Sequence, residues 1–184
     1  MKKFTQYIKE NYISLIVKFV VVAVIIALDL ITKSLSQNMK GDKTFIPNVI
    51  SFSFVKNTGA AFGIFENGSA WLAIFSVIFL IVFVLYDLGN KEQNWFSKLG
   101  FAFIFSGAIG NMIDRIFLGY VRDFISFDFI NFPVFNVADV AITIGCGLYV
   151  IYLITYVFDI RKKKKIEKTT TMQTNENTDD NKEI

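Results

Sequence analysis

Long apolar runs separated by polar segments dominate the chain. Two runs, at 70–86 and 140–158, contain no charged residue, and each reaches the roughly 17 to 25 residues that a spanning helix needs. A third run, at 99–113, is shorter, and we expect its helix to continue into the outer part of the bilayer. Another run begins near the amino terminus. The pattern therefore predicts four membrane-spanning helices, at about residues 13–33, 70–87, 98–115 and 137–159.

The first run carries two charges, Lys18 near one end and Asp29 near the other. A lysine at this place can extend its ammonium group to the lipid headgroups, whereas Asp29 needs a partner. Because Lys2 and Lys3 precede the run, it could be mistaken for a cleaved secretory signal. No small-residue cleavage pattern follows it, and Asp29 and Lys33 stand where one would be expected. We therefore expect an uncleaved first span.

Basic residues set the expected orientation of the spans. They gather in the two terminal segments and in the short connection after the second span, and such segments stay on the cytoplasmic side. An even number of spans puts both ends on one side, so we expect both termini in the cytoplasm. The longer connections, at 34–69 and 116–136, then face outward. We expect one membrane domain at 1–160, followed at 161–184 by a disordered cytoplasmic tail.

The two outer connections contain segments in which apolar and polar residues alternate, as they do in strands. The segments lie at about 48–56 and 121–129. In the second, alternation places Asp123 on the apolar face and Asp128 on the opposite face with Arg122. Burial against apolar neighbours raises the pKa of a carboxyl group, as proton transfer near neutral pH requires. The alternative is that this short segment is not a strand.

The predicted fold class is therefore an all-α membrane protein, with four transmembrane helices and a small extracytoplasmic β-sheet subdomain. Composition agrees, because 53% of the 184 residues are hydrophobic and 21 are phenylalanine. The net charge is only +3, and its distribution indicates membrane topology, so no nucleic-acid partner is expected.

Missing residue types narrow the chemistry. The chain has no histidine and a single cysteine, Cys146. Zinc sites built on these residues, Ser/His/Asp triads and Cys/His dyads are therefore excluded, and we expect neither a metal nor a cofactor. Catalysis would have to use carboxylates, hydroxyls, amides, lysine or arginine.

Polar side chains cluster at the outer ends of three predicted spans, at spacings of three or four residues that place them on one helix face. The clusters are Asp29 with Lys33, Asn111 with Asp114 and Arg115, and Asn136 with Asp139. Such groups are costly in a membrane, so each needs a function or a structural partner. The structural alternative is that the pairs Asp29–Lys33 and Asp114–Arg115 are ion pairs that hold the bundle together.

Five motifs, in this order, resemble the bacterial lipoprotein signal peptidases, also called signal peptidase II. They are Asp29-Leu-Ile-Thr32-Lys33, Asn57-Thr-Gly59-Ala-Ala-Phe-Gly63, Gly107-Ala-Ile-Gly110-Asn111-Met-Ile-Asp114-Arg115, Val121-Arg-Asp123-Phe-Ile125 and Phe135-Asn136-Val-Ala-Asp139. The family usually has two adjacent glycines where this chain has Ser106 and Gly107. From the residues alone, the run that begins at Asn57 is either a place of close backbone approach or an ordinary turn.

The resemblance implies an aspartyl endopeptidase of the bacterial cytoplasmic (inner) membrane, with its active site at the outer face. It would remove the signal peptide from diacylglyceryl-modified prolipoproteins and cut just before the lipidated cysteine. It implies Asp123 and Asp139 as the catalytic carboxylates. The substrate-binding or supporting residues that it implies are Asp29, Lys33, Asn57, Gly59, Asn111, Asp114, Arg115 and Asn136. It further implies contact with membrane lipid and inhibition by globomycin-type peptides, and we expect a monomer.

Simple electrostatics is consistent with such a pair. Two carboxylates about 4 Å apart repel by roughly 4 kcal/mol at an effective dielectric of about 20, so they would share one proton. Two other functions stay open: transport through intramembrane polar groups, and a noncatalytic chaperone for lipoproteins. Transport would need polar groups at successive depths. The second and fourth predicted spans offer little beyond Ser76 and Thr143.

Overall fold

Four helices and three strands make up the described part of the chain. The structure is a computed structural model, which describes residues 2–59, 65, 68–90 and 93–180. The helices are α1 (Lys2–Gln37), α2 (Ser69–Gly89), α3 (Trp95–Leu118) and α4 (Val137–Asp180), and the strands are β1 (Lys43–Ile46), β2 (Ile50–Asn57) and β3 (Val121–Phe127). Each helix contains a segment long and apolar enough to cross a membrane: Tyr12–Gln37, Ser69–Gly89, Trp95–Leu118 and Val137–Lys164. The predicted fold class is confirmed.

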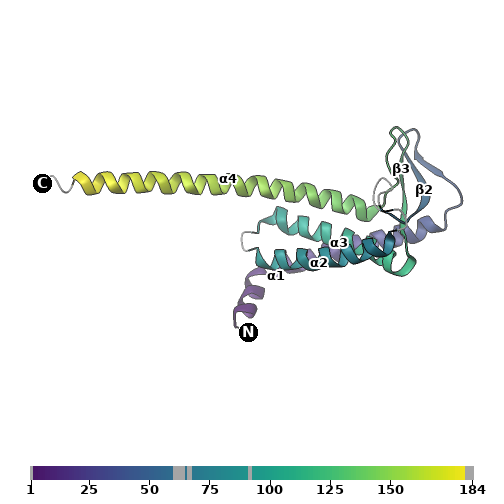
Figure 1. The fold of residues 1–184 in the computed structure, drawn as a ribbon, viewed down its shortest axis with the longest axis horizontal. Coiled ribbons are helices and arrows are strands. Elements are labelled where there is room, and N and C mark those ends of the chain that lie inside the picture. The colour runs from purple at the N-terminus through teal and green to yellow at the C-terminus, as the bar shows by residue number, and fades with distance from the viewer. Residues whose placement is uncertain (1, 60–64, 66–67, 91–92, 181–184) are drawn as a thin grey trace.

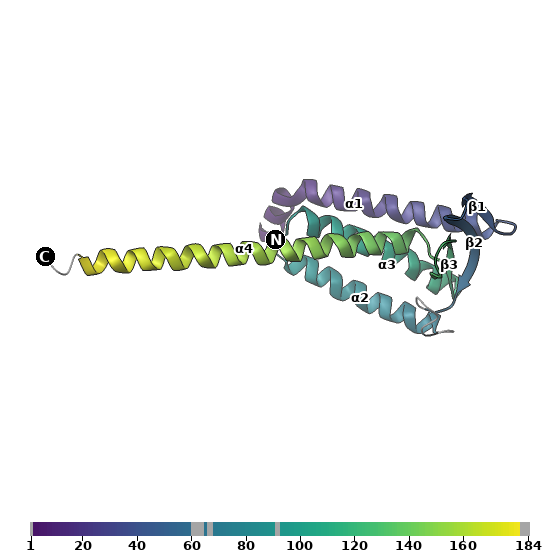
Figure 2. The ribbon, with the colours of Figure 1, turned by 90° about the horizontal axis from the view of Figure 1, so that it is seen from above.

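The helices run side by side, and the sheet covers one end of the bundle (Figures 1 and 2). Helix α3 lies at the centre and packs against α1, α2 and α4. The start of α1, the end of α2, the start of α3 and the end of α4 lie away from the sheet (Figure 1). Helix α4 continues to Asp180, through the segment expected to be disordered. That this segment is a cytoplasmic tail outside the membrane domain stays a prediction.

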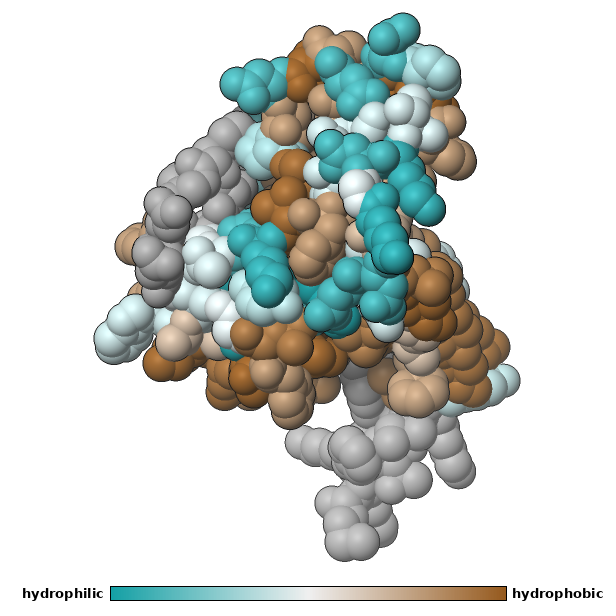
Figure 3. Space-filling model, turned by 90° about the vertical axis from the view of Figure 1, so that its right-hand side faces the viewer, coloured by the Kyte–Doolittle hydropathy of each residue, from teal (hydrophilic) through white to brown (hydrophobic). Residues whose placement is uncertain are grey.

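The surface changes character between the sheet and the helices. Seen from the sheet end, hydrophilic side chains gather over this face, whereas hydrophobic side chains cover the flanks of the helices (Figure 3). Large apolar side chains stand exposed along the spans, for example Phe19 on α1, Phe75 on α2 and Leu153 on α4. Lipid is the environment that suits such a surface. The sheet end is therefore the part built to meet water.

Small residues on α3 allow its neighbours to approach closely. A β-carbon at Gly107 would collide with the carbonyl oxygen of Ala138 on α4, and one at Gly110 would collide with the Asp29 carboxylate of α1. Ser106, which stands where the family usually has glycine, is fully buried, and its hydroxyl donates to the Ala102 carbonyl oxygen at 2.8 Å. Close approach at Gly107 and Gly110 brings the polar ends of α1, α3 and α4 together.

We expect Gly107→Ala to destabilise the protein by about 1–3 kcal/mol, because the added methyl group would push α3 away from the α4 backbone. Gly147→Ala is the matched control, since a β-carbon there meets nothing within 4 Å and alanine favours a helix over glycine. Thermal unfolding of the two variants in the same detergent measures the difference. Equal unfolding temperatures would contradict the proposed close contact.

The sheet has the strand order β1-β2-β3, and both pairings are antiparallel. Strands β2 and β3 correspond to the two predicted segments, so the alternation there did indicate strands. β1 was not predicted, because its four residues are all exposed and carry no alternating pattern. β3 ends at Phe127, two residues earlier than expected, although the Asp128 amide still donates to the Val49 carbonyl oxygen at 3.1 Å, beside the last strand pair.

Lys18 pairs with an acidic residue of a neighbouring helix, a contact that the sequence did not predict. Its ammonium group lies 2.7 Å from the Asp87 carboxylate at the end of α2, and 4.8 Å from the centre of the Phe101 ring. Gln93 donates to the same carboxylate at 2.9 Å. The Asp87 carboxylate compensates the buried charge of Lys18. The contact joins α1 to α2 at the end away from the sheet.

Candidate active site

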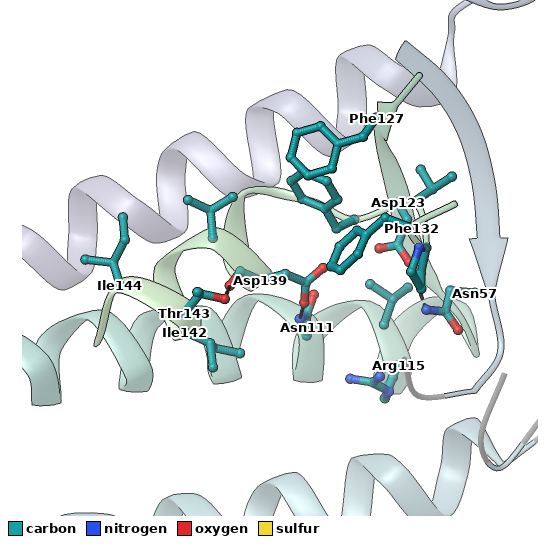
Figure 4. A pocket seen from close by; sticks show the side chains of 15 residues that line it. Asn57, Asn111, Arg115, Asp123, Phe127, Phe132, Asp139, Ile142, Thr143 and Ile144 are labelled. Atoms are coloured by element: carbon teal, nitrogen blue, oxygen red, sulfur yellow. Dashed lines mark hydrogen bonds between the residues drawn. The ribbon is translucent and has the colours of Figure 1, made fainter. Parts of the chain in front are cut away.

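Polar side chains from four elements line one cavity beneath the sheet (Figure 4). Its volume is about 490 Å³. The polar members are Asn57 of β2, Asn111 and Arg115 of α3, Asp123 of β3, and Asp139 and Thr143 of α4. The rest of the wall is apolar and includes Phe127, Phe132 and Phe135. The cavity can therefore take a largely apolar molecule with a polar group held near the carboxylates.

Asp123 is almost completely buried, with 2% of its surface exposed. β3 places it opposite Val55 of β2. Asn57 donates to one carboxylate oxygen at 2.8 Å, and Asn136 donates to the other at 2.6 Å. Burial raises the pKa of the Asp123 carboxyl to about 6. The hydrogen bonds from Asn57 and Asn136 lower this pKa, and the nearby charge of Asp139 raises it. Burial has the largest effect, so the net shift is upward.

Asp139 sits in the first turn of α4 and closes a capping box with Asn136. The Asn136 backbone amide donates to Oδ2 of Asp139 at 3.0 Å, and the Asp139 amide donates to Oδ1 of Asn136 at the same distance. This reciprocal pair satisfies two backbone donors that the start of a helix leaves free. Asn111 donates to the other Asp139 oxygen at 2.8 Å. The three-residue spacing of Asn136 and Asp139 thus reflects a helix start.

Two amides connect the carboxylates. The Asn136 side-chain amide donates to Asp123 at 2.6 Å and to Oδ1 of Asn111 at 3.1 Å, and Asn111 in turn donates to Asp139. Lys33 fixes the direction of this chain, because its ammonium group donates to Oδ1 of Asn111 at 2.9 Å. The Asn111 NH₂ group must then face Asp139. Residues 123 and 139 therefore belong to one hydrogen-bonded unit.

A fully buried charge cluster supports this unit from behind. The Lys33 ammonium lies 2.7 Å from Asp29 and 3.7 Å from Asp114. The second Asp29 oxygen accepts a hydrogen bond from the Ala138 amide at 2.9 Å, which caps α4. The predicted pair Asp29–Lys33 is thus present, and it ties α1 to the start of α4.

The predicted pair Asp114–Arg115 is wrong. Asp114 instead accepts hydrogen bonds from the Arg122 guanidinium group, at 2.7 and 3.1 Å, and from its backbone amide at 3.0 Å. Consecutive helix residues do not face each other, so Asp114 and Arg115 point to different neighbours. The contact with Arg122 fixes the turn between α3 and β3, and with it the position of Asp123.

Arg115 faces the cavity. One guanidinium nitrogen donates to the Gly59 carbonyl oxygen at 3.2 Å, while its buried Nε has no hydrogen-bond partner among the described residues. The Gly59 amide donates to Oδ1 of Asn57 at 3.0 Å, which turns the Asn57 NH₂ group toward Asp123. The remainder of this motif, residues 60–63, lies outside the described residues. Asn57 and Arg115 thus line one side of the cavity, and Gly59 connects them.

The sequence analysis did not propose Arg122 or the phenylalanine side chains of the cavity wall as site residues. Alternation placed Arg122 on the strand face away from Asp123, and its helix partner is visible only after folding. Phe127 packs against Phe132 and Phe135, with ring centres 5.8 and 5.1 Å apart. The high frequency of phenylalanine between residues 127 and 135 was the sequence signal that could have indicated this apolar wall. No group of three or more His, Cys, Asp or Glu side chains that could hold a metal ion occurs among the described residues.

The raised pKa of Asp123 predicts a pH-dependent stability. A carboxyl group whose pKa is higher in the folded than in the unfolded state stabilises the fold when protonated, so this stabilisation is lost as the pH rises from about 4 through about 6. The shift from 3.8 to about 6 corresponds to roughly 3 kcal/mol at most. We expect Asp123→Asn to flatten this part of the unfolding-temperature profile. Parallel profiles for the two proteins would contradict this origin.

Comparison with known proteins is consistent with the geometry. Residues 21–155 match the family model described as signal peptidase (SPase) II. A lipoprotein signal peptidase of Enterococcus faecalis is 40% identical over 143 residues, which cover 76% of this chain and 89% of that protein. One of Microcystis aeruginosa is 45% identical over 133 residues, which cover 69% and 85%.

Solved structures of similar fold are bacterial membrane enzymes. One, determined by the in meso method at 2.3 Å resolution, is 31% identical with a TM-score of 0.72, and the match covers 76% of this chain and 88% of that one. A second, at 1.9 Å resolution, is 32% identical with a TM-score of 0.68, and the match covers 74% and 92%. Both similarities extend over most of the part that contains the four spans and the sheet.

Proposed function

Because the chain belongs to the signal peptidase II family, we propose that it removes the signal peptide from diacylglyceryl-modified prolipoproteins by an aspartyl mechanism. The cut would fall just before the lipidated cysteine. One observation carries this proposal: Asp123 and Asp139, far apart in the sequence, line one cavity and are connected through the amides of Asn111 and Asn136. Family membership favours peptidase activity over transport or a chaperone role.

Two carboxyl groups in a mostly apolar cavity can together catalyse the hydrolysis of a peptide bond. An ionised carboxylate takes a proton from water as the water oxygen attacks the scissile carbonyl carbon. A protonated carboxyl group donates to the developing oxyanion, and the leaving amine is protonated as the C–N bond breaks. The pKa of Asp123, about 6, lets this group give and take a proton near neutral pH.

The other site residues would position these groups and the peptide. Asn57 and Arg115 line the cavity and could contact the peptide, while Gly59 holds both of them through hydrogen bonds. Asn111 and Asn136 orient the two carboxylates. Asp29, Lys33 and Asp114 would act as supports, because their charges are used in contacts that hold α1, α3 and α4 together.

The location follows from the same arrangement. We propose that the sheet end faces the outer side of the bacterial cytoplasmic membrane and that both termini lie in the cytoplasm. A substrate with a diacylglyceryl group could then diffuse laterally to the cavity without leaving the bilayer. Its acyl chains would contact the apolar helix flanks, and a globomycin-type peptide would compete for the same cavity. We expect one copy of the chain to be sufficient.

Cleavage of a defined substrate tests the proposal. Purified full-length protein in detergent is given a prolipoprotein either with or without the diacylglyceryl group, and both products are analysed by mass spectrometry. We expect cleavage of the lipidated form alone, with the modified cysteine as the new amino terminus. A cut elsewhere would contradict the proposed specificity. Proton flux in liposomes without peptidase activity would favour transport instead.

A further inference from the structure

The two carboxylates occupy different electrostatic surroundings. Asp139 lies at the third position of α4, where the aligned peptide dipoles favour a negative charge. One of its oxygens accepts a backbone amide of the same helix start, and the other accepts the Asn111 side chain. A protonated Asp139 would turn one of these oxygens into a hydroxyl, which is a poorer acceptor for the amide that faces it. The helix start therefore surrounds this carboxylate with hydrogen-bond donors and with the positive end of the α4 dipole.

Asp123 also lies near the start of α4, but among the described residues no backbone amide of that helix donates to its carboxylate. It lies on β3, is more deeply buried than Asp139, and accepts only side-chain amides, from Asn57 and Asn136. Burial penalises the charged form of a carboxyl group, and this residue is the one whose pKa rises to about 6. When one proton is shared by the pair, its more favourable place is Asp123.

The amide chain keeps the two environments distinct. Lys33 holds Oδ1 of Asn111, so Asn111 can only donate to Asp139. Asn136 cannot exchange its roles either, because its Oδ1 accepts the Asp139 amide while its NH₂ group faces Asp123. Neither amide can rotate without breaking at least two hydrogen bonds. The asymmetry is thus built into the fold and does not depend on the substrate.

We propose that the two carboxylates have fixed roles: Asp139 is the base that activates water, and Asp123 is the acid that holds the proton. The inference rests on the aspartyl mechanism proposed above. Asp139 takes a proton from water as the new C–O bond forms, and Asp123 gives its proton to the carbonyl oxygen. When the C–N bond breaks, the proton on Asp139 passes to the leaving amine, and the intermediate's hydroxyl returns a proton to Asp123.

Other charged groups near the pair do not reverse this order. Lys33 on α1 and Arg115 on α3 are the cations whose charges act on the site, and Arg115 interacts with both carboxylates. Lys33 lowers the pKa of Asp123, yet burial outweighs its effect. On the α4 side, the charge of Asp139 itself raises the pKa of Asp123.

Infrared spectroscopy of the full-length protein can locate the proton. Difference spectra between pH 5 and pH 8 report the C=O stretch of each carboxyl group that loses a proton in this range. We expect the wild type to show a band that is kept in Asp139→Asn and lost in Asp123→Asn. Asp128→Asn, on an exposed residue of the same outer subdomain, is the matched control and should keep the band.

Each other outcome overturns the assignment. Loss of the band in Asp139→Asn alone would exchange the two roles, and loss in both variants would mean that neither residue holds the proton by itself. A band that persists in both variants would belong to another group, and no band in the wild type would leave the pair without a titrating proton. Cleavage of the lipidated prolipoprotein by the same wild-type preparation is measured in parallel, so failure of the proposed function is seen separately from failure of this inference.

Discussion

Asp123→Asn and Asp139→Asn are each expected to lower the rate of signal-peptide release by about 10²- to 10⁴-fold or more, because each removes one proton-transfer group. Both variants should still fold. Asparagine keeps an oxygen that can accept the capping-box hydrogen bond at position 139, and at position 123 it replaces a buried carboxyl group with a neutral one of the same shape. Release is measured as the gel shift of a lipidated prolipoprotein, with substrate in excess.

Asp128→Asn is the matched control for this experiment. Asp128 follows β3, is exposed, and bonds to the Ser51 hydroxyl at 2.7 Å outside the cavity. Its substitution should leave the rate unchanged. Unfolding temperatures of all three variants separate lost catalysis from lost structure. A folded Asp123→Asn or Asp139→Asn protein with near wild-type activity would exclude that residue from the chemistry.

Lys33→Met is expected to lower the free energy of unfolding by about 3–5 kcal/mol, because it removes the cation from a buried cluster and leaves carboxylates without compensation. Lys33 is fully buried and contacts both Asp29 and Asp114. Thermal or denaturant unfolding in detergent measures the loss. Lys40→Met, at an exposed position after α1, is the matched control and should be close to neutral.

A double variant tests the cause of that loss. Asp29→Asn combined with Lys33→Met removes both charges of the closest pair, while Asp114 keeps its hydrogen bonds to Arg122. Part of the stability lost in Lys33→Met should therefore return. If the double variant were less stable than Lys33→Met alone, lost packing and not uncompensated charge would be the main effect.

The local parts of the site could be predicted from the sequence. Helix spacing places Asp29 beside Lys33 and Asn136 beside Asp139, and both contacts occur as short hydrogen bonds. Strand alternation placed Asp123 on a buried face, where the structure has it. These contacts join residues within four positions of each other or depend only on strand geometry, so the backbone pattern alone decides them.

Contacts between distant segments could not be predicted in this way. Lys18 meets Asp87, 69 residues away, and Asp114 turns away from its neighbour Arg115 to meet Arg122. The sequence supplied each charge but not its partner. Which partner is reached depends on how closely the helices pack, and that distance is set by glycines whose role appears only when a second helix lies against them.

The sequence by itself determined the four apolar spans, two neighbouring strands of the sheet, and the acids and amides at the sheet ends of the helices, because lipid solvation and backbone periodicity act on local composition. Only the tertiary structure decided that Asn111 and Asn136 connect Asp123 to Asp139, and that Lys33 fixes the direction of that connection. A hydrogen-bonded network needs atoms placed to within a few tenths of an ångström. Such precision comes from the packing of α1, α3, α4 and β3 against one another.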